Sequence, residues 1–358
     1  MSTLAVNTIT NAAGANTAQI NGMTPTAQSL QGLRNRIING DMRVDQRNAG
    51  ASVTLAASAV FPVDRFFGFE DTDGTMTGQQ DSSAPAGFTN SLKITTTVAD
   101  ASLAAAQFAF VRHNIEGTNF SDLGWGSANA QTVTLSFWTR SSLTGTFGGS
   151  VMNSAQNRVY PFSYAISAAN TWEYKTITIP GDTTGTWLTS NGTGLQINFG
   201  LGVGSTYSGT AGAWAGAAVF APTGAVSVIG TLSATFQITG VQLEAGSVAT
   251  PFERRPYGQE LALCQRYFRK TDATLYGEAT IYGYTATGQS LGQSVPYPVA
   301  MRAAPTATYG GTWSRVNTTG GVIEPYQTSY FPYISAASTG ALYQYPNNSG
   351  FVTFSAEL

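Results

Sequence analysis

The two residue types that most often supply metal ligands, nucleophiles and proton carriers are nearly absent from this chain. It has one cysteine, Cys264, and one histidine, His113. A lone cysteine excludes a disulfide within the chain and a zinc site made of several cysteines. A Ser-His-Asp site would have to use His113, in the strand-like segment FVRHNIEG, and the sequence has no nucleophile-elbow, dinucleotide or phosphate-loop motif. We therefore expect a protein that is not an enzyme and needs no cofactor.

Carboxylates leave one enzymatic alternative open. A polysaccharide depolymerase needs two carboxyl groups, one protonated and one ionised. Most of the 19 acidic residues lie in turns or beside an arginine, as in Asp64-Arg65 and Glu253-Arg254. Spacing alone does not show which of them meet in the fold, so a polysaccharide depolymerase stays the alternative to a binding protein.

One run of acids resembles a cation-binding turn. Residues 70–74 read Glu-Asp-Thr-Asp-Gly, and oxygen-rich turns of this kind can bind calcium. The run lacks the later bidentate glutamate of an EF-hand, and Asp-Gly turns are common at protein surfaces. We therefore interpret it as a solvated turn and expect no metal site.

Tyrosines are the best indication of a binding surface. Twelve of the 16 tyrosines lie at or beyond Tyr257, and residues 321–350 are dense in Tyr, Pro, Asn and Ser. Aromatic rings stack on the apolar faces of sugars, and hydroxyl and amide groups satisfy the polar rims. The predicted ligand-binding residues are Tyr326, Tyr330, Tyr333, Tyr343 and Tyr345. The alternative is that these tyrosines fill a small β core or the axis of a trimer.

Composition excludes several classes of partner. Only 10% of the 358 residues are charged, against about 25% in ordinary soluble proteins. A net charge of −2 disfavours nucleic-acid binding and attachment to an anionic membrane, because both need a basic surface. No apolar run is long enough for a transmembrane helix, and the N-terminus lacks the pattern of a secretory signal. We expect no nucleic-acid partner and no membrane insertion.

The elements that must position these residues are mainly short strands. From about residue 52 to 250, segments with period-two alternation are separated by Gly, Asn, Asp and Ser clusters, which predicts an antiparallel β-sandwich or barrel. In QTVTLSFWTR, Val133, Leu135 and Phe137 share the face expected to point inward. Apolar spacing predicts a short helix over 259–268, with Cys264 on its apolar face. Residues 271–358 are predicted to form a smaller β domain.

Two long stretches carry no charge. Residues 1–33 are uncharged and show neither a helical nor a long strand pattern, so they are either a disordered tail or an arm that orders against another subunit or protein. Residues 183–243 are uncharged as well, which indicates packing against sister subunits or a thick core rich in Gly, Thr and Ala. The predicted organisation is an N-terminal arm (1–35), a larger antiparallel β domain (36–255), a helical junction (256–270) and a smaller β domain (271–358).

Several long strings of this chain resemble one known family. They are NTIT…NG, LRNRIINGDMRVDQRNAG, PVDRFFGF, TVTLSFWTRSS and TGVQLEAGSVATPFERRPYGQELALCQRYFRK. In this order they resemble the tail-fibre proteins of tailed bacteriophages, from about residue 34 to 270, and the first string is similar to fibres of cyanobacterial phages. INGDMRVDQR and the string ending in CQRYF carry the most specific part of the resemblance.

The resemblance implies a function and an assembly. It implies a jelly roll like that of carbohydrate-binding modules, a helix-bearing junction and a variable tip that meets the host. It also implies a homotrimer in the virion, assembled in the host cytoplasm, with its N-termini on baseplate or tail proteins and its tip on a host surface glycan. Residues 271–358 carry the weakest resemblance, as is usual for a host-specific tip. A bacterial carbohydrate-binding module or adhesin is a third interpretation, which the missing signal sequence weakens.

Overall fold

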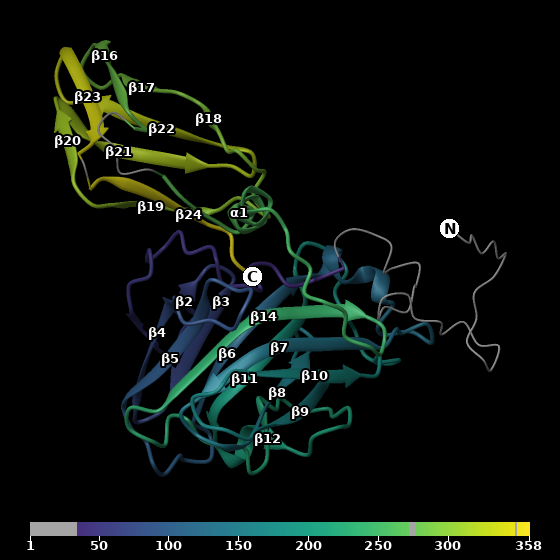
Figure 1. The fold of residues 1–358 in the computed structure, drawn as a ribbon. Coiled ribbons are helices and arrows are strands. Elements are labelled where there is room, and N and C mark those ends of the chain that lie inside the picture. The colour runs from purple at the N-terminus through teal and green to yellow at the C-terminus, as the bar shows by residue number, and fades with distance from the viewer. Residues whose placement is uncertain (1–33, 272–276, 348) are drawn as a thin grey trace, which may run out of the picture.

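Two antiparallel sheets face each other and form a β-sandwich, shown in the lower half of Figure 1. The computed structural model describes residues 34–271, 277–347 and 349–358. Of the predicted arm, 1–35, residues 1–33 therefore lie outside the described residues. The first sheet has the order β1 (Val53–Thr54), β4 (Thr75–Asp81), β5 (Ser91–Val98), β14 (Thr235–Ala245), β7 (Val133–Ser141) and β10 (Glu173–Ile179). The second has the order β2 (Val60–Val63), β3 (Phe66–Asp71), β6 (Phe108–Glu116), β11 (Thr193–Val203), β8 (Gly145–Met152) and β9 (Val159–Ile166). The predicted antiparallel sandwich is confirmed.

Alternating side chains build the sandwich core. In β7, Val133, Leu135 and Phe137 are buried between the sheets, whereas Trp138 points to the opposite face. Phe137 packs edge-on against Phe199 of β11, in the other sheet, with ring centroids 5.1 Å apart. Each such side chain contributes about 1.5–3 kcal/mol of burial free energy. The period-two pattern therefore produces the layer contact that it predicts.

The uncharged stretch 183–243 supplies central strands of both sheets. β11 and β14 are buried along most of their length, so a charged side chain there would need a buried partner. The core within one chain is therefore enough to explain why these strands carry no charge between residues 183 and 243. The loops between them hold η3 (Ser205–Tyr207) and the short parallel pair β12 (Ser208–Gly209) and β13 (Ala221–Pro222), and they are partly exposed. Two further 3₁₀ turns, η1 (Gly117–Asn119) and η2 (Ser121–Leu123), follow β6.

The predicted helix forms, but its bounds differ from the prediction. α1 runs over Tyr257–Gln265, not over 259–268. Phe268 instead begins β15 (Phe268–Lys270), because this segment pairs with β24 (Phe351–Ser355). Cys264 is fully buried on the apolar face of α1, as predicted. In the part of the chain that the structure describes, no helix is long and apolar enough to cross a membrane.

Beyond α1, the described residues form three small sheets, seen at the top of Figure 1. The first has the order β15, β24 and β19 (Thr306–Gly310), and the second has the order β16 (Ile281–Thr285), β23 (Gly340–Pro346) and β20 (Trp313–Val316). In the third, β22 (Ser329–Ala336) pairs with β17 (Ser290–Gly292), β18 (Val295–Pro296) and β21 (Thr318–Pro325). We call residues 277–358 the C-terminal module.

Buried charges join this module to the sandwich. Arg47 and Arg65 belong to the sandwich part of the chain, and both donate to the carboxylate of Glu357. Arg65 is almost fully buried and also lies over the ring of Tyr267, 3.6 Å from its centroid. Arg302 donates to the backbone carbonyls of Ala356 and Glu357. The C-terminal strand therefore returns to the sandwich and is held there by ion pairs and hydrogen bonds.

Candidate functional site

One sheet face in the C-terminal module carries a group of tyrosines. Strands β16, β23 and β20 lie side by side, and Tyr282 of β16 is directly opposite Tyr343 of β23. Along β23, Leu342 and Gln344 are buried beneath the sheet, so Tyr343 and Tyr345 project to its other side. Ile281 is buried in the same way, which leaves Tyr282 and Tyr284 on the outer side. We call Tyr282, Tyr284, Tyr343 and Tyr345 the tyrosine face.

Two of the four rings of this face are largely exposed, and the other two are half-buried. Tyr282 and Tyr284 are 81% and 73% exposed, the highest values among the exposed large hydrophobic residues that the structure describes. The rings of Tyr343 and Tyr345 are half-buried and stack on each other, with centroids 5.5 Å apart and planes inclined by 27°. Directly opposed residues on one sheet face have Cβ atoms about 4.5–5.5 Å apart, so Tyr282 extends the row that begins at Tyr343. The result is one outer sheet face that carries four tyrosine side chains, two of them largely exposed.

The structure brings together only two of the five predicted tyrosines. Tyr343 and Tyr345 lie on the tyrosine face, whereas Tyr333 lies on β22 in a different sheet, next to Phe331. Tyr326 is exposed at the turn between β21 and β22. Its hydroxyl donates to Glu324 at 3.1 Å, and this hydrogen bond raises the pKa of the tyrosine.

The prediction of an exposed contact residue is wrong for Tyr330. Its side chain is fully buried between Tyr297 and Phe354, with centroid distances of 5.5 and 4.6 Å. Its hydroxyl donates to Glu278 at 3.1 Å, and burial raises its pKa. Tyr330 is a core residue because β22 buries every second side chain, and Tyr330 has the parity of Ile334 and not that of Tyr333.

Tyr282 and Tyr284 were not among the predicted ligand residues. The sequence signal for them is the alternation in IYGYT, which resembles that in LYQYP of residues 342–346. Only the antiparallel register of β16 against β23 shows that the two alternating pairs share one face.

His113 occupies a core position. It is 1% exposed and its ring packs on Phe66, with centroids 4.7 Å apart. Burial, with a further contribution from the charge of Arg65, holds the pKa of His113 well below its usual range. The imidazole is therefore neutral at pH 7.

Two of the most buried acids, Glu116 and Asp182, are held by arginines. Glu116 accepts hydrogen bonds from Arg266 at 2.9 and 2.6 Å, and Asp182 accepts two from Arg158 at 2.7 Å. In both cases burial raises the pKa of the carboxyl group, but the hydrogen bonds and the arginine charge outweigh it, so the net shift is downward. These carboxylates are ionised partners in structural pairs.

The acidic run at residues 70–74 forms hydrogen bonds within the run and to Asp100. Glu70 accepts hydrogen bonds from the backbone and hydroxyl of Thr72, and Asp73 donates its backbone N–H to Asp100 at 3.2 Å. Among the described residues, no group of three or more His, Cys, Asp or Glu side chains is placed to hold a metal ion.

Comparison with known proteins gives similarities of fold only. No family model matches the chain, and no curated protein matches it. Solved structures that resemble it include the enzymatically active domain of bacteriophage CBA120 tailspike protein 4, at 12% identity and a TM-score of 0.32, covering 60% of this chain and 22% of that one. A carbohydrate-binding module of family 4 is similar at 13% identity and a TM-score of 0.28, covering 58% of this chain and 98% of that one.

A third similar structure contains a ligand. It is the family 11 carbohydrate-binding module from Clostridium thermocellum in complex with a β-1,3-1,4-mixed-linked tetrasaccharide, at 10% identity and a TM-score of 0.28, covering 56% of this chain and 98% of that one. At TM-scores of this size the likeness does not establish a shared function. The β-sandwich described above is defined by the strand pairing of this chain itself.

Proposed function

We propose that this chain is a non-enzymatic tail fibre of a tailed bacteriophage that adheres to a polysaccharide on the host cell surface. The observation that carries the proposal is the tyrosine face, on which Tyr282 and Tyr284 are largely exposed and the rings of Tyr343 and Tyr345 stack. Aromatic rings bind the C–H faces of sugars, and phenolic hydroxyls can exchange hydrogen bonds with the sugar hydroxyls. An enclosed pocket is not needed, because a polymer can lie along a flat face.

The virion role is supported by the sequence strings that resemble phage tail fibres. In this proposal residues 1–35 attach the fibre to the baseplate or tail, and the C-terminal module faces the host. The chain acts as a homotrimer. A single aromatic stack contributes only about 0.5–1.5 kcal/mol beyond its buried area, so one chain alone binds a sugar weakly. Three linked copies raise the effective concentration for the second and third contacts.

Cell binding tests the receptor role. Fluorescently labelled full-length protein is incubated with a panel of bacterial strains, and Tyr282→Ala and Tyr343→Ala are compared with the wild type. We expect each variant to reduce binding at least tenfold, with little change in melting temperature. The matched control is Tyr257→Ala, which removes a tyrosine that is 53% exposed on α1 and should bind normally. Equal binding by all variants would contradict the proposal.

The size of the polysaccharide after incubation separates the two functions. Capsular polysaccharide from a bound strain is incubated with the protein and analysed by gel filtration. We expect the polymer to bind without any loss of chain length. A progressive fall in its size would identify a depolymerase instead.

The mass of the assembly tests the homotrimer. Native mass spectrometry should give three times the 37.5 kDa chain mass. A stable monomer at micromolar concentration would refute this part of the proposal.

A further inference from the structure

A second aromatic surface lies on the sandwich, on the outer side of the first sheet. Tyr174 of β10 is directly opposite Trp138 of β7, with ring centroids 5.4 Å apart. Phe88, in the loop before β5, packs edge-on against Phe252 at 5.2 Å, and Phe252 belongs to the segment that leaves the sandwich after β14. We call Tyr174, Trp138, Phe88 and Phe252 the sandwich strip.

A glycine connects the two pairs of rings. Gly240 of β14 has φ +62°, and a Cβ placed on it would lie 2.8 Å from the ring of Phe88 and 3.2 Å from the ring of Trp138. The missing side chain therefore lets both rings close over the same position of the sheet. Because β10, β7 and β14 are consecutive in the sheet, the four rings cross it as one row. Tyr174 is 43% exposed, and the other three rings are half-buried.

An unpaired positive charge lies at one end of this row. The guanidinium of Arg254, an exposed residue, lies over the rings of Phe88 and Phe252, at 4.6 and 5.8 Å from their centroids. Within the described part of the chain, no acceptor or carboxylate partners this guanidinium. Stacking on the two rings therefore holds the guanidinium in place, while its N–H groups are available to a ligand. A carboxylate fits this planar set of donors.

Further polar groups line the side of the strip. Arg140 is two residues from Trp138 on the same face of β7, and it donates only to neutral acceptors: Asn170 O, Ser83 Oγ and Gln237 Oε1. Lys93 is opposite Gln237 and pairs with Asp81 at 3.5 Å. Glu244 of β14 lies on the same face and accepts hydrogen bonds from Gln242 and Thr250. Among the described residues, Arg254 and Arg140 are therefore the positive charges of this surface that no carboxylate pairs with.

We infer that the sandwich strip is a second carbohydrate site, separate from the tyrosine face, and that it binds an acidic polysaccharide containing uronate residues. Sugar rings would lie on Trp138 and Tyr174, and a carboxylate would pair with Arg254. Arg140 supplies a second positive charge along the polymer. A neutral polymer would use the rings but would leave the Arg254 guanidinium without its partner.

Affinity electrophoresis of the full chain tests this inference. The probes are polygalacturonate, alginate and hyaluronan, each cast into a native gel, and a neutral mixed-linkage β-glucan serves for comparison. We expect at least one uronate polymer to retard the wild type, with an effect that weakens as salt is raised. Arg254→Ala should reduce the affinity for that polymer at least tenfold. Because Arg254 is exposed, this variant should keep the wild-type melting temperature.

Two controls make the result specific. Arg315→Ala removes another exposed arginine that lies over aromatic rings, in this case Tyr309 and Trp313 of the C-terminal module, and it should bind as the wild type does. The double variant Tyr282→Ala/Tyr343→Ala should also keep uronate binding, even if it loses cell binding. The inference is overturned if no uronate polymer retards the wild type, if Arg254→Ala binds normally, or if the tyrosine double variant loses the retardation.

Discussion

Burial changes the chemistry of single charged residues at the junction between the sandwich and the C-terminal module. Asp64 is 1% exposed, and it accepts hydrogen bonds from Arg47 at 3.1 Å and from Gln46 at 2.5 Å. Burial nevertheless outweighs these partners and raises its pKa from 3.8 to about 6. The folded protein therefore binds this proton more tightly than the unfolded chain does.

The sign of this shift predicts a pH dependence. The contribution of Asp64 to stability is fully present below pH 3.8 and is lost as the pH rises through about 6. A shift of this size corresponds to about 3 kcal/mol. In Asp64→Asn, the slope of unfolding free energy against pH between 4 and 6.5 should become more positive than in the wild type. Urea unfolding of the wild type and of Asp64→Asn at several pH values measures this slope, and equal slopes would contradict the prediction.

Tyrosines of the C-terminal module should divide into two kinds when mutated. Tyr330→Ala removes a fully buried ring and should cost about 3–5 kcal/mol, because it leaves a cavity between Tyr297 and Phe354. Tyr282→Ala removes a ring that is already in solvent and should cost less than about 0.5 kcal/mol. Thermal unfolding of both variants measures the difference. Similar losses of stability would mean that Tyr282 is covered in the folded protein.

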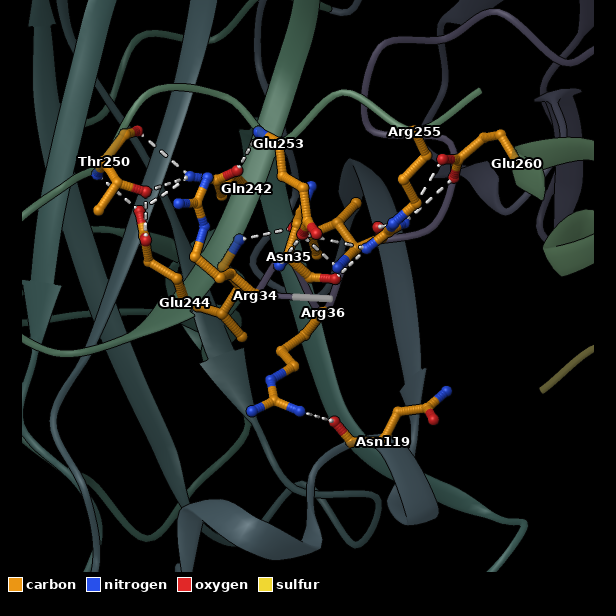
Figure 2. Close-up of polar contacts among 12 residues, drawn as sticks. Arg34, Asn35, Arg36, Asn119, Gln242, Glu244, Thr250, Glu253, Arg255 and Glu260 are labelled. Atoms are coloured by element: carbon orange, nitrogen blue, oxygen red, sulfur yellow. Dashed lines mark hydrogen bonds and ion pairs between the residues drawn. The ribbon is translucent and has the colours of Figure 1, made fainter. Parts of the chain in front are cut away.

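At the scale of elements, a buried polar network ties α1 to the first described segment of the chain (Figure 2). Arg255 donates to the backbone carbonyls of Asn35 and Ile37, and its guanidinium pairs with Glu260 at 3.4 Å. Glu260 also accepts the backbone N–H of Asn39. Figure 2 shows Asn35 between Glu253 and Arg255, so segments far apart in the sequence meet at one point.

A double-mutant cycle tests this network. Glu260→Ala should destabilise the protein by about 3–5 kcal/mol, because it removes the nearer carboxylate of the buried Arg255 and leaves only Glu253, at 3.7 Å. Adding Arg255→Ala removes the poorly compensated charge, so the double variant should lose at least about 1 kcal/mol less than the sum of the single variants. Chemical denaturation measures all three. Additive losses would show that the two side chains act independently.

At the scale of the whole molecule, the sandwich and the C-terminal module are coupled through Glu357. Its carboxylate forms ion pairs with Arg47 and Arg65, and Arg302 donates a hydrogen bond to its backbone carbonyl. Asn114 of β6 also donates to the carbonyl of Leu358, at 2.8 Å. These contacts make the last residues of the chain part of the sandwich surface.

Removing the Glu357 carboxylate should uncouple the two parts. Glu357→Ala leaves Arg65 buried without a carboxylate, and we expect a loss of about 3–5 kcal/mol and a separate, earlier unfolding step for the C-terminal module. Differential scanning calorimetry would show two transitions where the wild type shows one. Glu173→Ala, at an ion pair with Lys175 within the sandwich, should keep a single transition. A single, unshifted transition in Glu357→Ala would contradict this account.

The sequence by itself determined the sandwich, because its strands combine apolar and polar alternation. In β7, the alternation of Val133, Leu135 and Phe137 with polar residues allows only one face to be buried. The burial of Cys264 followed in the same way from helical spacing. The sequence did not predict where α1 ends, because the pairing of Phe268 with Ser355 outweighs the local preference for helix.

Only the tertiary structure decided which aromatic residues form surfaces. Residues 330–334 read Tyr-Phe-Pro-Tyr-Ile, so both faces of this strand are apolar and the sequence does not show which one is buried. Packing against Tyr297 and Phe354 settled it and buried Tyr330. Register against β23 placed Tyr282 beside Tyr343, and the sheet order placed Trp138 near Phe88 across Gly240. Such contacts join residues that are distant in the chain, and local patterns carry no information about them.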